Sequence, residues 1–276
     1  MTTHQPSTDT QRQLAHAFRA LHVPGQPLAL ANAWDVATAR IAEESGAPAV
    51  ATTSAGVAWS LGAPDGDVLE REQALELVGR IVAAVRTPVS ADVEGGFGTD
   101  ADTVAETVTK VIAAGAVGIN IEDGDRSPAE FAQRLSAARA AADSSGVPLF
   151  INVRTDVYLR GLTEPAARLE ETFARARAYL EAGADGIFVP GTSDLLTIAE
   201  LVKGIDAPVN ILVGPGSPSV AELASVGVAR VSLGSAVAEH AYSMARHAAK
   251  ELLEQGTYTT LTTSGGYRSL NTLFGG

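Results

Sequence analysis

Two short acidic stretches, each following an apolar segment, carry the residues best suited to chemistry. The first is 91–98, ADVEGGFG, and the second is 119–123, INIED. Asp92 and Glu94 are two residues apart on an extended chain and point to the same side, and Glu122 comes from the next strand. Active sites of barrels with alternating strands and helices lie at the carboxyl ends of the strands. Three converging carboxylates predict a magnesium site there, bound directly or through water.

Further polar groups follow other predicted strands. Arg154 ends the fifth strand, where its planar guanidinium is suited to binding a substrate carboxylate. Alternatively, it forms a plain salt bridge that balances the charge of the neighbouring acids. Backbone amides in the loop after the second strand could take a second anionic group, at Thr53, Ser54, Ala55 and Gly56. A cation beside these groups could stabilise negative charge that develops on an enolate oxygen.

A recurring unit along the chain must position these groups. Each unit is a helical stretch that ends near glycine and is followed by a short apolar strand. The glycines of the four clearest copies are Gly46, Gly115, Gly183 and Gly227. Extending this pattern predicts eight strands, near 28–33, 49–53, 88–93, 117–122, 148–154, 185–190, 208–213 and 228–233.

Eight strands that alternate with helices predict an α/β protein with a parallel sheet. We expect a single-domain (β/α)8 TIM-type barrel over 28–254, with an N-terminal helical segment over 1–27 and a C-terminal tail, extended or mobile, over 255–276. A doubly wound open sheet is the alternative. It is less favoured because 32–35, NAWD, stands where a G-x-G-x-x-G fingerprint would follow the first strand.

Composition narrows the classes of partner. The net charge of −12 argues against nucleic acid, and the lack of cysteine excludes disulfides and thiolate chemistry. No apolar run approaches the ~20 residues that span a bilayer, and the first 26 residues have no apolar core of a secretion signal. We therefore expect a cytoplasmic protein that contacts neither nucleic acid nor membrane.

The sequence resembles the isocitrate lyase/phosphoenolpyruvate mutase superfamily over most of its length. The matching strings lie at 52–66, 91–98, 119–123, 152–156 and 209–216. This resemblance implies a modified (β/α)8 barrel that binds Mg²⁺, with Mn²⁺ as an alternative, and a small 2-oxo or 2-hydroxy acid. It also implies reactions through an enolate of the pyruvate type. A homotetramer in which neighbouring subunits exchange the last helix is implied as well.

The resemblance also suggests roles for individual residues. Asp92, Glu94 and Glu122 resemble the metal-site acids, with Glu94 standing where aspartate is usual. Thr53, Ser54 and Ala55 match the loop that cradles the substrate carboxylate, beside Gly56 and Asp92. The remaining matches are a substrate-binding arginine, an acid on the loop after strand two and a polar substrate contact, at Arg154, Asp65 and Asn210. Arg154, Asp65 and Glu122 are therefore the candidate catalytic residues.

One departure from the family concerns the reaction itself. Lyases of the superfamily carry K-x-C-G-H after strand four, and the cysteine serves as acid or base. Here 124–131 reads GDRSPAEF, and Ser127 or Pro128 already marks the start of a helix. Asp125 or Glu130 could substitute as the acid, although either could equally be a solvated acid at the helix start.

These observations predict a magnesium-dependent enzyme that acts on a small 2-oxo or 2-hydroxy (di)carboxylate. Carbon–carbon cleavage or decarboxylation is favoured over phosphoenolpyruvate or phosphonopyruvate mutase or hydrolase chemistry, because no extra cationic cluster for a phosphonate is visible. A non-catalytic carboxylate-binding homologue is the alternative from another class. A Schiff-base aldolase is disfavoured because all three lysines lie on predicted helices, at Lys110, Lys203 and Lys250.

Overall fold

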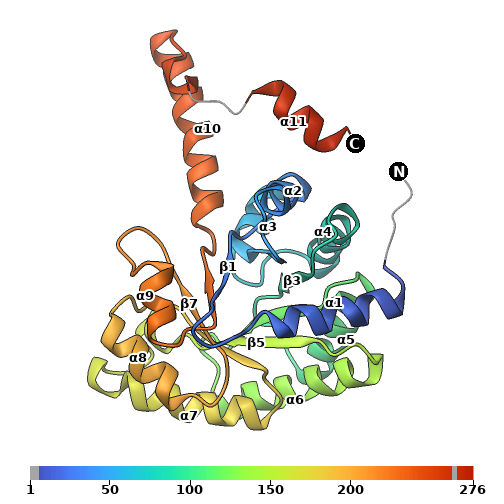
Figure 1. Ribbon diagram of the computed structural model, residues 1–276, viewed down its shortest axis with the longest axis vertical. Helices are drawn as coiled ribbons and strands as arrows, with labels where there is room; N and C mark the ends of the chain where they lie inside the picture. Colours follow the sequence, from blue (N-terminus) through green and yellow to red (C-terminus); the bar gives the residue numbers. More distant parts are fainter. Residues whose placement is uncertain (1–5, 263–265, 276) are drawn as a thin grey trace.

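A computed structural model describes residues 6–262 and 266–275 of the chain. Its eight parallel strands follow the order β1-β8-β7-β6-β5-β4-β3-β2, with helices around them (Figure 1). The strands are β1 Leu28–Leu30, β2 Val50–Ala51, β3 Val89–Asp92, β4 Gly118–Glu122, β5 Phe150–Arg154, β6 Gly186–Val189, β7 Val209–Leu212 and β8 Arg230–Ser232.

The sheet closes between β1 and β2 through a single residue, Ala33. Its amide donates to the Ala51 carbonyl at 2.8 Å, and its carbonyl accepts from the Thr53 amide at 3.0 Å. All eight strands lie inside the ranges predicted from the sequence. The (β/α)8 barrel is therefore confirmed.

The helices fill the connections between strands. They are α1 Thr8–Ala20, α2 Val36–Glu44, α3 Ser54–Ser60, α4 Arg71–Ala84, α5 Ala101–Ala113, α6 Pro128–Ser145, α7 Arg168–Glu181, α8 Leu195–Gly204, α9 Val220–Ser225, α10 Ala236–Gln255 and α11 Tyr267–Phe274. Short helices η1 Val157–Gly161, η2 Pro165–Ala167 and η3 Thr259–Leu261 complete the set. The glycines of the repeat occupy left-handed conformations after their helices, with φ of 91°, 96°, 108° and 90° at Gly46, Gly115, Gly183 and Gly227.

Helix starts follow the sequence signals closely. The Asp100 side chain accepts from the Thr103 amide at 2.8 Å and caps α5. Ser127 caps α6 directly before Pro128, so the loop after β4 is as short as the sequence predicts. This brevity keeps the segment that follows Glu122 close to the barrel mouth.

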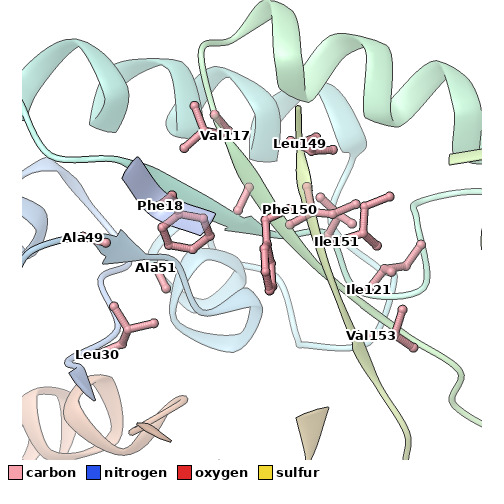
Figure 2. Close-up of a cluster of buried hydrophobic side chains, with 14 of the residues drawn as sticks. Phe18, Leu30, Ala49, Ala51, Val117, Ile121, Leu149, Phe150, Ile151 and Val153 are labelled. Carbon is pink, nitrogen blue, oxygen red and sulfur yellow. The ribbon is translucent and has the colours of Figure 1, made fainter. Parts of the chain in front are cut away.

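The amino end of the barrel is covered by α1, which lies beside β5 in Figure 1. Phe18 of α1 is fully buried and meets Phe150 edge-on, with ring centroids 5.8 Å apart. Gly118 permits this contact, since a Cβ there would lie 2.5 Å from the Phe18 ring. Figure 2 shows these two rings among the aliphatic side chains of the core. The site-bearing end of the barrel is thus the opposite, carboxyl end.

The last long helix departs from the ring. Figure 1 shows α10 standing away from the barrel, instead of packing between α9 and α2. Only Ala238 and Glu251 of its 20 residues are buried. No helix among the described residues is long and apolar enough to cross a membrane.

The C-terminal tail contains helices. Within 255–276, η3 and α11 are helical, where the sequence predicts a tail that is extended or mobile. The Thr and Gly content that suggested extension surrounds a short apolar pattern at Tyr267, Leu270 and Phe274, which is compatible with one helix face.

Replacing Phe18 with alanine tests the packing of α1 beneath the barrel. We expect Phe18→Ala to lower the free energy of unfolding by about 3–5 kcal/mol, because it leaves a cavity against Phe150 and Gly118. Urea denaturation measures this. Leu196→Ala is the control, since Leu196 is 78% exposed and should change little. A loss no larger than the control's would contradict the account of the covered barrel end.

Candidate functional site

Three charged side chains terminate three consecutive strands. Asp92 is the last residue of β3, Glu122 of β4 and Arg154 of β5. Glu122 and Arg154 are partners in the β4–β5 register. Because parallel strands end at the same rim, these groups share the carboxyl end of the barrel. The structure therefore brings together the two strand-end acids and the arginine that the sequence predicts.

Asp92 is held by backbone amides. Its carboxylate accepts from the Glu94 amide at 3.2 Å and from the Ser54 amide at 3.4 Å. Ser54 is the first residue of α3, which follows Thr53 as its cap. No ion pair of Asp92 with a basic side chain occurs among the described residues. Asp92 is thus the strand-end acid whose charge is left for an outside cation.

Glu94 is turned toward the loop that follows α3. Its Oε2 accepts from the Gly66 amide at 3.1 Å and also from the Asp67 amide. Glu94 is 2% exposed and has φ of 51°, a left-handed conformation that is costly for a residue with a Cβ. The Glu94 backbone adopts this left-handed conformation, and the Glu94 carboxylate is hydrogen-bonded to the two loop amides.

Gly95, in the loop after β3, lets the loops after α3 and β4 approach closely. The Gly95 amide donates to Asp67 Oδ1 at 3.2 Å, and Asp67 Oδ2 lies 3.6 Å from Arg126 Nη2. A Cβ on Gly95 would lie 2.6 Å from Asp67 and 2.7 Å from Arg126. The loops after α3, β3 and β4 are therefore joined at one point beside the site.

Glu122 and Arg154 form a close ion pair that continues to Asp156. Arg154 Nη1 lies 2.5 Å from Glu122 Oε2. Its Nε and Nη2 donate to the two Asp156 oxygens at 2.7 and 3.0 Å. Asp156 is fully buried and also lies 3.1 Å from Arg160. The bidentate pair fixes the plane of the Arg154 guanidinium.

The position of Asp156 is set by Asp123, the last residue of the INIED string. Asp123 Oδ1 accepts from the Asp156 amide at 2.9 Å. Its Oδ2 accepts from Arg175 Nη1 and from the Tyr179 hydroxyl, each at 2.8 Å. Asp123 is fully buried, so its removal would leave buried donors unpaired. Helix α7 thereby supports the arginine at the rim.

The acids of the site destabilise one another's charged forms. Burial raises the pKa of Glu122 to about 8 and that of Glu94 to about 7, and neighbouring carboxylates add to both shifts. Burial also raises the pKa of Asp92, against the opposing effect of Arg154. In the same cluster, Glu122 and Asp156 raise the pKa of Arg154. Asp92 and Glu94 have no arginine partner among the described residues, which leaves negative charge that no ion pair balances.

This charge surplus suits a divalent cation, but the ligands are not already arranged around one. Among the described residues, no three His, Asp or Glu side chains are placed to hold a metal ion as they stand. Glu94 is bonded to backbone amides and Glu122 to Arg154. The expected convergence of all three carboxylates on one point is therefore not seen, because the protein's own donors neutralise two of them.

Other predicted site residues lie around this centre. Thr53, Ser54, Ala55 and Gly56 form the start of α3, with all but Ser54 buried. Asp65 is exposed on the following loop, and its charge still raises the pKa of Glu122. The amide of Asn210 is committed to Asn152, Ser232 and backbone carbonyls. A substrate contact by Asn210 stays a prediction.

The two candidate acids of the short fourth loop are engaged with arginines. Asp125 lies 2.8 Å from Arg160, and Glu130 lies 3.3 Å from Arg134 in the first turn of α6. Both side chains are more than half exposed, at 78% and 51%. Each resembles the solvated acid expected at a helix start.

Sequence reasoning missed Asp67, Arg126 and Arg230. Asp67 and Arg126 lie in loops without any apolar periodicity, so only the folded structure shows them meeting. Arg230 could have been found from the sequence. It lies two residues before Ser232 in β8, so the two side chains point to the same face of the strand. An inward-facing arginine in a barrel strand is unusual enough to notice.

Comparison with known proteins identifies the family. Residues 18–253 match the family model described as phosphoenolpyruvate phosphomutase. The chain belongs to this family. A crystal structure from Burkholderia cenocepacia J2315, described as a candidate lyase/mutase, superposes with a TM-score of 0.89 at 40% identity and covers 98% of both chains. The resemblance to the isocitrate lyase/phosphoenolpyruvate mutase superfamily is thus confirmed.

Curated relatives in this superfamily carry more than one activity. The chain is 32% identical over 238 residues to oxaloacetate decarboxylase of Ectopseudomonas mendocina, covering 82% of this chain and 80% of the relative. It is also 32% identical over 208 residues to 2-methylisocitrate lyase of Escherichia coli K12, covering 70% and 67%. The relatives of this chain thus include a decarboxylase and a lyase.

The raised pKa values predict how stability depends on pH without a metal. An acid whose pKa is raised in the folded state contributes its full stabilisation below its unfolded pKa, about 4.5. This stabilisation is lost as the pH rises through the pKa of the folded state. The window for Glu122 is therefore about 4.5 to 8. Between pH 5 and 8, the free energy of unfolding of the wild type should fall. We expect it to fall by at least about 1 kcal/mol less in Glu122→Gln.

Urea denaturation of the metal-free protein at both pH values measures this effect. Glu76→Gln on the surface of α4 is the control, because Glu76 is 66% exposed and pairs with Arg80 on the same helix. Equal pH dependence in the wild type and Glu122→Gln would contradict the assigned environment of Glu122.

Proposed function

We propose that this protein is an Mg²⁺-dependent enzyme that cleaves a carbon–carbon bond or decarboxylates a small 2-oxo or 2-hydroxy dicarboxylate through a pyruvate-type enolate. The observation that supports this most directly is the rim of Asp92, Glu122 and Arg154 at the ends of β3, β4 and β5. It joins a surplus of buried negative charge to a fixed carboxylate-binding fork. The named activities of the relatives are consistent with the same chemistry.

Arg154 would bind and orient the substrate carboxylate. Asp156 already fixes the guanidinium plane through Nε and Nη2, so Nη1 is the position from which a substrate could displace Glu122. Such an exchange would replace one carboxylate on Arg154 by another and release Glu122. At the start of α3, the amides of Ala55 and Gly56 would bind the remaining anionic group, because those of Thr53 and Ser54 donate to Ala33 and Asp92.

Glu122 is then the side chain able to hold a proton at the site. Burial raises its pKa to about 8, so a Glu122 released from its ion pair with Arg154 would take up a proton near neutral pH. After displacement from Arg154 it could exchange a proton with the enolate, and the exposed Asp65 could exchange one with solvent. This assignment does not need the missing cysteine of the fourth loop.

The cation would be held by Asp92, with Glu94 and Glu122 at its bound waters, and Mn²⁺ is an alternative to Mg²⁺. When bound, the cation supplies positive charge that polarises the 2-oxo group. Asp92 is suited to direct contact because it has no basic partner among the described residues. Its two amide hydrogen bonds would hold the carboxylate in place.

A non-catalytic carboxylate-binding protein is the second candidate. It is favoured by the short fourth loop, in which Asp125 and Glu130 are both engaged with arginines. Such a protein would bind oxalate with Mg²⁺ yet form no product from any substrate. Phosphoenolpyruvate or phosphonopyruvate chemistry is a third candidate, supported by the family model. Cytoplasmic location stays a prediction.

We also propose that the protein is a homo-oligomer, as a tetramer, in which α10 of one copy packs on another. A groove of about 970 Å³ lies where the eighth helix of a barrel would pack, lined by Ile41 of α2, Val220 of α9 and Leu233 after β8, among others. Leu252 and Leu253 of α10 are 56% and 84% exposed. A helix with exposed leucines and an apolar groove in one chain are complementary surfaces for a second copy.

Removing the Asp92 carboxylate tests the proposed reaction. Wild-type protein with Mg²⁺ is incubated separately with oxaloacetate, 2-methylisocitrate, phosphoenolpyruvate and phosphonopyruvate, and pyruvate and phosphate are measured. We expect pyruvate from a carbon–carbon substrate, and at least a ~100-fold lower kcat/KM in Asp92→Ala, because the cation contact is lost. Asp100→Ala, which removes a carboxylate that only caps α5, should retain activity.

Retained activity in Asp92→Ala would show that the acids are not the metal site. Inertness of wild-type protein toward all four compounds with Mg²⁺ and Mn²⁺ would contradict the proposed reaction. Calorimetry with oxalate then identifies the non-catalytic binder, which would take up oxalate and Mg²⁺ without turnover.

Charge placed on α10 tests the oligomer. We expect light scattering to give a tetramer for the wild type and a smaller species for Leu253→Asp, because burying an aspartate in an apolar contact is costly. Gln255→Asp, which adds the same charge two residues further along the exposed helix, should remain tetrameric. A monomeric wild type would contradict the proposed packing of α10.

A further inference from the structure

Arg230 is a cation enclosed within the barrel. It is the first residue of β8 and is fully buried. Its Nη2 lies 3.3 Å from Asn120 Oδ1 on β4. In the ring, β8 and β4 are separated by β7, β6 and β5, so the side chain crosses the interior to the opposite wall.

No acidic side chain forms an ion pair with Arg230 among the described residues, and its Nε and Nη1 have no hydrogen-bond partner there. On the side toward α1, its guanidinium carbon lies 6.0 Å from the Phe18 ring centroid. Arg19 and Asp185 are titratable groups on that side and pair with each other, and His22 is the third. Burial and the charge of Arg230 lower its pKa to about 3, so His22 is neutral.

The positive charge is therefore uncompensated below and faces acids above. Asn120 is the register partner of Asp92, and Glu122 follows Asn120 by two residues on the same face of β4. Asp92 is the acid whose charge acts on Arg230 and favours its protonated form, although burial lowers the pKa of Arg230 to about 10. Arg230 remains a cation at neutral pH, one layer beneath the candidate metal site.

Polar side chains connect this cation rigidly to the strands of the site. Asn120 Oδ1 accepts from Asn152 Nδ2 at 2.9 Å as well as from Arg230. Asn152 also donates to Asn210 at 3.0 Å, and Asn210 donates to Ser232 at 3.2 Å. The layer thus links β4, β5, β7 and β8, which limits how far the arginine can move.

A buried charge with no ion partner is unfavourable for the fold, because desolvation is not repaid by pairing. We propose that Arg230 is a positioning residue for the site: its fixed positive charge beneath Asp92 and Glu122 favours binding of an anionic substrate and limits the affinity for the divalent cation. This inference rests on the proposed function, since it requires that the rim binds a cation and an organic acid. Arg230 itself contacts neither.

The test compares two affinities in one set of variants. Mn²⁺ binding is followed by electron paramagnetic resonance, and oxalate binding at saturating Mn²⁺ by calorimetry. Arg230→Gln removes the charge and keeps an amide donor. We expect it to bind Mn²⁺ at least about threefold more tightly and oxalate at least about threefold more weakly, whereas Arg230→Lys stays near wild type.

Opposite changes distinguish a charge effect from damaged packing, which would weaken both ligands. Arg139→Met controls for the loss of one positive charge, since Arg139 bonds to Gly183 and Asp185 at the other end of the barrel. It should change neither affinity. Arg230→Met is a second neutral variant, and thermal melting reports whether each variant folds.

Unchanged affinities in folded Arg230→Gln and Arg230→Met overturn the inference, as does a parallel loss of both affinities. Failure of both neutral variants to fold, with Arg230→Lys folded, would assign Arg230 to the structure alone and also overturn it. If wild-type protein binds neither Mn²⁺ nor oxalate, the proposed function fails and this inference fails with it. If the wild type binds Mn²⁺ and oxalate and the Arg230 variants bind them equally well, only the inference about Arg230 is overturned and the proposed function stands.

Discussion

The site is organised by the mutual repulsion of carboxylates that the barrel buries at one rim. Asp92 and Glu122 end neighbouring strands, Glu94 follows closely, and burial raises the pKa of each. Water screens these charges poorly, so each needs a proton, a basic side chain, amide donors or a cation. In the structure, Glu122 is paired with a basic side chain, Arg154, and Glu94 accepts hydrogen bonds from backbone amides. Asp92 also accepts amide bonds but lacks a basic partner, so an outside cation would act there.

The surrounding fold provides the rigidity that such a cluster requires. Arg154 is fixed by Asp156, which is fixed in turn by Asp123 and α7. The loops after α3, β3 and β4 meet where Gly95 permits them to. From below, the layer that contains Asn120 and Arg230 sets the electrostatic background. Each support begins with a residue buried in the barrel and ends at the rim, so site geometry and core packing depend on each other.

The sequence predicted strand positions and the identity of the rim residues because both depend on local patterns. Apolar segments, glycine caps and an acid directly after a strand can be recognised without tertiary information, as for Asp92 and Glu122. The direction in which a side chain turns cannot. Glu94 faces two loop amides, and Asp67 meets Arg126, because of loops whose courses follow from long-range packing. The departure of α10 from the ring also depends on packing that local patterns do not show.

The most direct test of the central claim is anomalous diffraction from crystals soaked with Mn²⁺ and oxalate. The account predicts one strong manganese peak beside the Asp92 carboxylate, with oxalate between the ion and Arg154 and with Glu122 moved off Nη1. A site with no manganese at Asp92, or with oxalate bound elsewhere while Glu122 keeps its contact with Arg154, would contradict it.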